Sequence, residues 1–222
     1  VGGNPSAIQI DESHSRGYFL DAENQTLRTV DLNSGATADV VSISARPFAL
    51  ALDTANQIAY VTSPSKNEVF EIGLASGAAT RSMSVIGSPS GVVLDGQRHR
   101  LLVVRTELAD VISLSLDHVG SLLSLLPVQT VAIGVSVGVR PGGMSLSTNG
   151  SAIAVVNETG DSISRINLSS GLTESVSKVL GQPRFVSNGY TDDQFIVSSV
   201  FSNSIVRVSL PGNGAIAEIP SQ

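Results

Sequence analysis

The sequence predicts an all-β fold in which one structural unit is repeated five times along 222 residues. Three sets of residues recur with the same spacing of 42, 42, 52 and 42 positions. They are the prolines Pro5, Pro47, Pro89, Pro141 and Pro183, the leucines Leu32, Leu74, Leu116, Leu168 and Leu210, and the residues Phe19, Val61, Val103, Val155 and Val197. Four short strand-like runs in a period of about 42 residues are typical of blades around an axis. We therefore predict a five-bladed β-propeller made of four-stranded antiparallel blades, with one blade for each repeat.

The five units follow one another directly, so we interpret the chain as a single domain over residues 1–222. Dividing the array would separate units that bury one another. We expect closure to depend on side-chain packing between the first and fifth blades, because the units begin and end in phase and leave no strand to cross the seam. The units cover residues of about 1–45, 46–87, 88–139, 140–181 and 182–222.

In the first unit, four runs rich in β-branched and apolar residues are separated by turn-forming residues. They predict strands over Ser6–Asp11, Gly17–Asp21, Thr26–Leu32 and Ala36–Ser44. No segment keeps an apolar period of 3.6 residues with a cap at both ends, so no helix is expected. Each unit should therefore form an up-and-down antiparallel sheet.

Turn residues recur at fixed places in the units. In three units a glycine stands three residues after the repeated leucine, where a hairpin needs a residue that tolerates positive φ: Gly35, Gly77 and Gly171. An aspartate closes the first strand in three units, where its carboxylate can accept hydrogen bonds from the following turn: Asp11, Asp53 and Asp95. Each repeated proline begins a unit, and we expect it to hold the preceding residue in an extended conformation.

The third unit contains ten extra residues, which must lie between Leu116 and Pro141 because Leu116 is still in phase. We place this insertion at Gly120–Gln129, in the connection between the third and fourth strands. An extended outer hairpin is the simpler interpretation. The alternative is an apolar flap that docks onto a partner.

Composition excludes several classes of protein. The net charge of −6 and the isoelectric point near 4.9 argue against binding to nucleic acid or to anionic membranes, which requires a basic surface. There is no cysteine, so disulfides and thiolate chemistry are excluded. No uninterrupted apolar run reaches the length of about 20 residues that inserts across a bilayer. The chain begins at Val1, which suggests a processed piece of a longer precursor and favours an extracytoplasmic, periplasmic or secreted, location.

The second unit resembles the YVTN-type β-propeller repeat, a family that includes lactonase-like propellers. Tyr60-Val61-Thr62 matches the family's strand motif with Ser63 in place of asparagine, and Asn157 restores the asparagine in the fourth unit. The third strand of the second unit, Val69–Ile72, and the following Gly77 fit the same repeat. The resemblance extends over the whole chain and implies the propeller fold. It implies little about function, because propellers carry unrelated activities on one scaffold.

Two patterns suggest catalysis or metal binding, but their positions do not support either. Residues 134–138 read Gly-Val-Ser-Val-Gly, as in a nucleophile elbow, but that motif needs a strand-to-helix turn and here lies in a predicted strand. His14, His99 and His118 are the only histidines, and they fall in turns of different units. We therefore expect these histidines to be solvated, and we predict no metal site, no cofactor and no catalytic residue.

The candidate binding site lies where two sets of loops emerge on the same rim of the blades. The residues before the repeated prolines include Arg46 and Arg140, and the ends of the second strands include Asp21, Arg105 and Asn157. Arg184 follows Pro183 on the same rim. Arginines gathered on one rim of an acidic protein could bind a carboxylate or a phosphate. The alternative is that they are ordinary surface arginines, balanced by Glu23, Glu107, Glu158 and Asp161 in the neighbouring loops.

Two functions are compatible with these observations. The first is a non-catalytic binding or scaffold domain of a larger extracytoplasmic protein, acting as a monomer and binding a protein or a small anionic ligand. The alternative is a lactonase- or hydrolase-type propeller enzyme with its site at the channel mouth. Such sites need converging histidines or carboxylates, and Asp21 is the only acid in the two sets of rim positions, so the first function is favoured.

Overall fold

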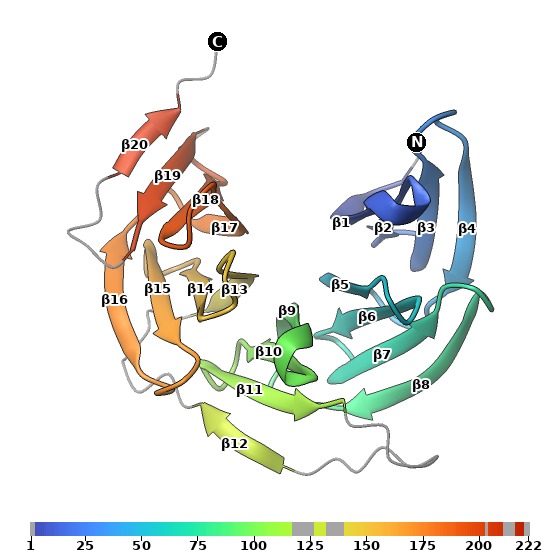
Figure 1. Cartoon of the computed structure of the whole chain (residues 1–222), viewed down its shortest axis with the longest axis horizontal. Helices are drawn as coiled ribbons and strands as arrows, with labels where there is room; N and C mark the ends of the chain where they lie inside the picture. The colour runs from blue at the N-terminus through green and yellow to red at the C-terminus, as the bar shows by residue number, and fades with distance from the viewer. Residues whose placement is uncertain (1–2, 117–126, 132–139, 203, 211–215, 220–222) are drawn as a thin grey trace. The chain divides into compact units, whose positions relative to one another are not determined.

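The computed structural model describes residues 3–116, 127–131, 140–202, 204–210 and 216–219. These residues form twenty strands in five four-stranded antiparallel sheets, together with two short 3₁₀ turns (Figure 1). The strands of each sheet pair in chain order, so each sheet is an up-and-down blade. The predicted fold class, an all-β propeller of five four-stranded blades, is confirmed.

The blades are numbered here in chain order. Blade 1 contains β1 (Pro5–Asp11), β2 (Arg16–Asp21), β3 (Thr26–Asp31) and β4 (Thr37–Ser42). Blade 2 contains β5 (Leu50–Asp53), β6 (Ile58–Ser63), β7 (Glu68–Gly73) and β8 (Ala78–Ser84). Blade 3 contains β9 (Pro89–Asp95), β10 (Arg100–Arg105), β11 (Asp110–Ser115) and β12 (Pro127–Val131).

Blade 4 contains β13 (Pro141–Leu146), β14 (Ala152–Asn157), β15 (Ser162–Asn167) and β16 (Thr173–Lys178). Blade 5 contains β17 (Pro183–Asn188), β18 (Gln194–Ser199), β19 (Ile205–Ser209) and β20 (Ile216–Ile219). The 3₁₀ turns η1 (Glu12–His14) and η2 (Gly96–Arg98) follow β1 and β9. The four strands predicted for the first unit agree with β1 to β4 within about two residues at each end, the usual uncertainty of strand limits.

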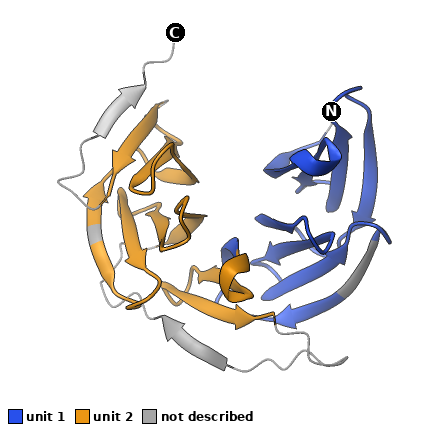
Figure 2. Ribbon diagram, in the orientation of Figure 1, with its two compact units in different colours: residues 1–94 blue, residues 95–222 orange. Residues whose placement is uncertain are grey.

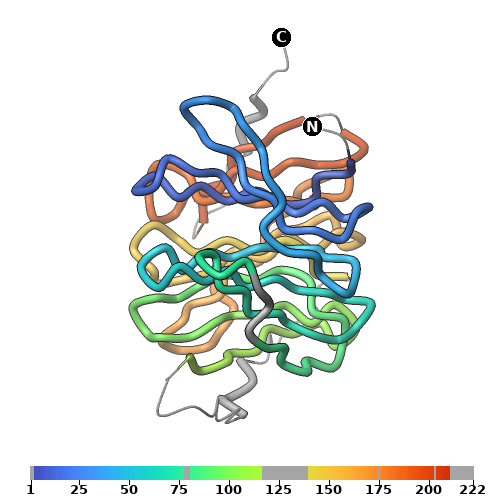
Figure 3. The backbone as a smooth tube through the Cα atoms, turned by 90° about the vertical axis from the view of Figure 1, so that its right-hand side faces the viewer, coloured from blue at the N-terminus to red at the C-terminus, as the bar shows by residue number. Residues whose placement is uncertain are grey.

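The chain also divides into two compact units, residues 1–94 and 95–222 (Figure 2). From here on, the first unit and the second unit mean these two parts, and the five repeats are identified by their blades. The first contains blades 1 and 2, and the second contains blades 4 and 5. Within the blades, short reversals join neighbouring strands at both ends of the sheets (Figure 3). The predicted hairpin glycines have positive φ, at +72° for Gly35, +62° for Gly77 and +70° for Gly171. No helix in the described residues is long and apolar enough to cross a membrane.

Each unit has a buried core between two blades, and the two cores use the same repeat positions. Blade 1 contributes Tyr18, Leu20 and Leu27, and blade 2 contributes Ala59, Val61, Phe70 and Ile72. Their counterparts 136 positions later are Ala154, Val156 and Ile163 of blade 4, and Phe195, Val197, Val206 and Val208 of blade 5. We call the face of a blade that packs on the following blade its front face, and the opposite one its back face. The repeat thus determines which side chains are buried.

The ten extra residues of the third repeat, blade 3, are divided between the connection before β12 and the connection after it. This corrects their predicted place at Gly120–Gln129. Leu114 pairs with Pro127, thirteen residues later, whereas its counterpart Ile166 pairs with Thr173, seven residues later. Six extra residues therefore precede β12, and the other four follow it. Pro127–Gln129 are part of strand β12 and not of the connection. Any residues that reach the hydrogen-bonding edge of β11 can pair with it, so the sequence alone does not determine where β12 begins. The remaining predicted positions lie outside the described residues.

Three of the five residues before the repeated prolines also differ from the expected extended conformation. Ser88, Arg140 and Gln182 have φ of +58°, +73° and +55°, so they are left-handed rather than extended. The chain must reverse within a few residues to leave one sheet and begin the next. The reversal is held by hydrogen bonds, because the amide of Ser88 donates to Asn67 Oδ1 over 2.8 Å and that of Gln182 donates to Asp161 Oδ1 over 2.9 Å.

Candidate functional site

The two sets of predicted rim positions lie next to each other within the blades. The amide of Ala22 donates to the carbonyl of Asn4, and the amide of Glu158 donates to that of Arg140. The amide of Val200 likewise donates to the carbonyl of Gln182. Each of these bonds joins the loop before a first strand to the loop after the second strand of the same blade. The sequence therefore placed the rim loops correctly within a blade.

In the first unit, Asp21 has a structural role. Its buried carboxylate accepts hydrogen bonds from the amides of Asn4, Glu23 and Asn24 at 3.3, 3.2 and 3.0 Å. The backbone amide of Asn24, followed by its side-chain amide, lowers the pKa of Asp21. Because these donors come from its own turn and from the loop before β1, Asp21 holds the rim together. Arg46 in the same unit is exposed, and its carbonyl accepts a hydrogen bond from Ser63 Oγ.

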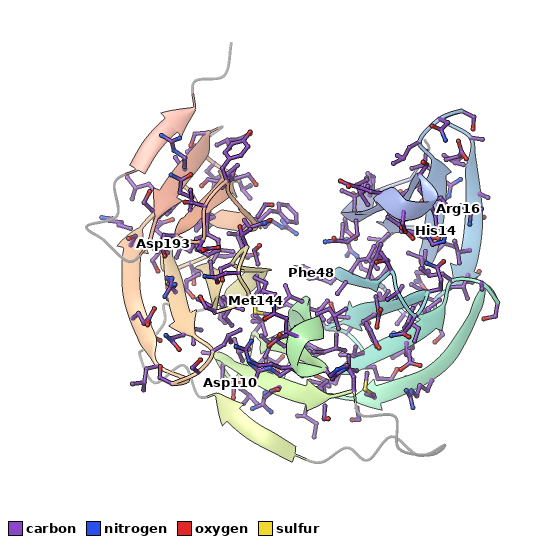
Figure 4. The ribbon with its side chains drawn as sticks, viewed as in Figure 1. His14, Arg16, Phe48, Asp110, Met144 and Asp193 are labelled. Carbon is purple, nitrogen blue, oxygen red and sulfur yellow. The ribbon has the colours of Figure 1, made fainter. Side chains whose placement is uncertain are left out.

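In the second unit, Arg105 and Asn157 also have partners inside their own blades. Arg105 Nε donates to Asp110 Oδ1 over 2.8 Å, and Nη2 donates to Oδ2 over 2.5 Å, across the β10–β11 pair (Asp110 is labelled in Figure 4). The hydrogen bond to Asp110 raises the pKa of Arg105. Asn157 is fully buried, and its Nδ2 donates to Ser162 and Ser164. Arg105 is therefore already neutralised, and Asn157 cannot reach a ligand in solvent.

Arg140 and Arg184 are the predicted rim residues that the second unit leaves exposed. Arg140 directly precedes β13, and Arg184 is the second residue of β17. These two first strands lie close together, because a Cβ added at Gly143 would be 2.5 Å from the carbonyl oxygen of Arg184. Neither guanidinium makes an ion pair with any described residue. Arg184 instead lies over the ring of Phe185, 5.8 Å from its centroid.

Phe185 was not among the predicted site residues, although its side chain is half exposed next to Arg184. The repeat carries a signal that could have identified it. The corresponding positions of the other blades hold only small residues: Ala7, Ala49, Gly91 and Gly143. A phenylalanine at a position that is otherwise alanine or glycine departs from the packing pattern of the repeat and indicates a local role.

A cluster of Asp11, Ser13 and His14 in the η1 turn contains the residue types of a catalytic triad (His14 is labelled in Figure 4). In a triad, aspartate and serine contact opposite nitrogens of the imidazole. Here Asp11 Oδ2 lies 2.8 Å and Ser13 Oγ lies 3.0 Å from the same atom, His14 Nδ1. Ser13 Oγ also donates to Asp11 Oδ1 over 2.6 Å. The cluster therefore caps a turn and does not generate a nucleophile.

The aspartates that close the first strands act in two ways. Asp11 and Asp53 accept the amides of His14 and Asn56, as predicted. Buried Asp95 makes no such cap, and its carboxylate instead accepts hydrogen bonds from Arg98 and Arg100, at 3.1 and 2.8 Å. Arginines three and five residues later offer a charged donor that outcompetes the turn amide. The prediction of a turn cap is therefore wrong for Asp95.

The histidines lie in separate turns where they are described. His14 is in η1 and His99 follows η2, as predicted, whereas His118 and the motif at residues 134–138 lie outside the described residues. Within the described part of the chain, no group of three or more histidine, aspartate or glutamate side chains is placed to hold a metal ion.

No family model and no curated protein matches the sequence, so membership of the YVTN-type family stays a prediction. Solved structures do match, each with 15% identity. Hydrazine synthase of Kuenenia stuttgartiensis matches with a TM-score of 0.77, over 97% of this chain and 66% of the other, slightly less than two thirds of its length. A nidogen/laminin complex matches with a TM-score of 0.79, over 97% and 78%. An inactive virginiamycin B lyase of Staphylococcus aureus, solved with quinupristin, matches with 0.75 over 98% and 71%. At this identity the matches show the propeller fold alone.

Proposed function

We propose that this chain is a non-catalytic binding domain of a larger extracytoplasmic protein, and that its ligand carries a carboxylate or phosphate. The observation that carries the proposal is the pair of exposed arginines, Arg140 and Arg184, at the start of neighbouring first strands in blades 4 and 5. Exposed guanidinium groups without an acidic partner favour an anion, which they can bind through two parallel hydrogen bonds.

The structure narrows the set of arginines in this proposal. Arg105 is removed from it, because Asp110 already occupies its guanidinium. Arg46 is exposed but belongs to the first unit, so the site is argued from blades 4 and 5 alone. Asp21 and Asn157 contribute by fixing the rim loops and not by touching a ligand.

Phe185 adds a preference within the class of anions. Its half-exposed ring lies beside Arg184, so an aromatic or other flat apolar group attached to the anion can pack there. Stacking of this kind adds about 0.5–1.5 kcal/mol to the burial of apolar area. We therefore expect phenyl phosphate to bind more tightly than inorganic phosphate.

The test is a titration of the protein with phenyl phosphate and, separately, with inorganic phosphate, in which NMR chemical shifts report binding. Replacing Arg140 and Arg184 together by alanine should weaken binding of phenyl phosphate by about 5- to 150-fold, since the charge-assisted hydrogen bonds that are lost should together be worth about 1–3 kcal/mol. A matched variant with Lys178→Ala and Arg16→Ala removes two exposed charges elsewhere and should bind like the wild type. Phe185→Ala should weaken the binding of phenyl phosphate and leave the binding of inorganic phosphate unchanged.

Two results would contradict the proposal. Wild-type protein that binds neither probe, or a double arginine variant that binds as well as the wild type, would remove the anion site. Turnover of a sugar lactone or a polyphosphate that depends on divalent metal would instead support the enzymatic alternative.

A further inference from the structure

The rim of blade 4 contains a carboxylate, Glu158, that makes no ion pair with any described residue. Glu158 is half-buried and directly follows β14. Its amide donates to the carbonyl of Arg140 over 3.0 Å, so its backbone is held beside one of the two proposed anion-binding arginines. The repeat does not require an acid here, because the corresponding positions of the other blades hold uncharged residues: Ala22, Pro64, Thr106 and Val200.

Gly142 gives this carboxylate its place. A Cβ added at Gly142 would be 2.9 Å from Glu158 Oε1 and 3.4 Å from Glu158 Cγ. The side chain of Glu158 therefore lies back over β13, in the space that a side chain at position 142 would fill. The corresponding positions of the other blades all carry a side chain: Ser6, Phe48, Ser90 and Arg184. Blade 4 thus combines a glutamate with the glycine that makes room for it.

The carboxylate and the two arginines lie along one short stretch of β13. Arg140 directly precedes this strand, and Glu158 lies over its second residue, Gly142. The third residue, Gly143, lies against the backbone of Arg184 in β17, the neighbouring first strand (Figure 1). Consecutive Cα atoms are about 3.8 Å apart, so one acid and two arginines are positioned within a few residues of one another.

These opposite charges do not pair with each other, which points to a ligand that carries both charges. The arginines favour a carboxylate or a phosphate, and a half-buried carboxylate is stabilised by a cation. A metal ion needs several protein oxygens around it, whereas a primary ammonium group has three donors and can pair with one carboxylate. An organic amine is therefore the cation that suits a single glutamate.

We propose that the ligand of this site is zwitterionic. Its primary amine binds Glu158, and the phosphate or carboxylate, a short carbon chain away, binds Arg140 and Arg184. This inference rests on the proposed anion site and adds a second charge to its ligand. Glu158 then also acts against ligands that carry only negative charge, because an anion without an amine is repelled by the carboxylate.

The test compares two phosphate esters of the same carbon skeleton, phosphoethanolamine and ethyl phosphate, which differ by the ammonium group. Each is titrated into the full chain, and NMR chemical shifts report binding. We expect the wild type to bind phosphoethanolamine about 5- to 20-fold more tightly than ethyl phosphate. This range lies between the values of an exposed ion pair and of a hydrogen bond to a charged group.

Two variants test the role of Glu158, and a third is the control. Glu158→Gln should abolish the preference for phosphoethanolamine without weakening the binding of ethyl phosphate. Gly142→Ala keeps the carboxylate but displaces it, so it should lower the same preference. Asp192→Asn removes a carboxylate from the turn after β17, beyond the end of the strand that is opposite to Arg184, and should keep the preference. Thermal unfolding confirms that the three variants are folded.

Three outcomes would overturn the inference. Equal binding of both esters that still depends on Arg140 and Arg184 would remove the amine and leave the anion site standing. A preference for phosphoethanolamine that Glu158→Gln retains would place the amine elsewhere. A wild type that binds neither ester would refute the anion site and the zwitterionic ligand together.

Discussion

The core between blades 1 and 2 and the core between blades 4 and 5 occupy the same repeat positions but distribute volume in opposite ways. In the first unit, Tyr18 on the front face is large and Ala59 on the back face is small. In the second unit, the front-face position holds Ala154 and the back-face position holds Phe195. A large side chain is exchanged for a small one on both sides at once, so the volume between the blades is kept while its source changes.

The same comparison shows a difference in polarity. Arg165 on the front face of blade 4 is buried and ion-paired with Glu174 and Asp193, whereas the corresponding residue of blade 1 is Thr29. A buried arginine costs desolvation unless its partners are kept in place. The second core therefore depends on charged residues of both blades, while the first depends on apolar packing.

The largest expected effect on stability comes from truncating the large aromatic side chain of either core. Tyr18→Ala and Phe195→Ala should each lower the free energy of unfolding by about 3–5 kcal/mol, because each leaves a cavity opposite a position that is too small to fill it. Chemical denaturation measures the loss. Tyr190→Ala is the control, since Tyr190 is 93% exposed, and it should change stability by less than about 0.5 kcal/mol. A small effect of Phe195→Ala would show that blades 4 and 5 are not held by this core.

A smaller effect tests the exchange of volume itself. Ala59→Phe should destabilise the first unit by about 1–3 kcal/mol through overpacking. Combined with Tyr18→Ala, it recreates the arrangement of the second unit, and the two changes should couple favourably by about 0.5–3 kcal/mol. A double-mutant cycle from denaturation curves gives the coupling energy. Additive losses would mean that the two positions do not share one volume.

The sequence predicted the elements that depend on local residues and repetition. Strand limits followed from alternation and turn residues, and Gly35 and Gly77 have the positive φ that their hairpins need. The division of the inserted residues was not predictable, because it depends on which residues of the long connection reach the edge of β11. Ser88 shows a similar limit, since an acceptor in another turn, Asn67, helps to hold its left-handed conformation.

The candidate site was predictable only in part. Repeat positions placed the rim loops of each blade together, but position alone does not reveal whether a charge is already used. Arg105 is paired because Asp110 directly faces it in the hairpin, a register that the strand limits could have indicated. Asp21 is enclosed by amides of its own turn, which only the folded backbone shows.

The smallest expected effect contrasts Asp11 in blade 1 with its counterpart in blade 4. That counterpart is Ser147, a neutral side chain that accepts no proton in this range. Hydrogen bonds from Ser13, followed by those from His14 and Gln57, lower the pKa of Asp11 from its ordinary value of 3.8 to about 2. Its ionised form therefore favours the folded state. The stabilisation is fully present above the unfolded-state value and is lost as pH falls through about 2.

Melting temperatures between pH 2 and 5 measure this contribution. Asp11→Asn should be less stable than the wild type at neutral pH but lose less stability on acidification, because one of the groups that take up protons on unfolding is gone. Ser13→Ala removes the strongest of the hydrogen bonds, so it should move the acid-induced loss toward higher pH without abolishing it. Asp21 and Asp31 also have lowered pKa values, so part of the acid dependence remains in both variants. An Asp11→Asn protein with the same acid-induced loss as the wild type would show that the cap of the β1 turn is not linked to folding.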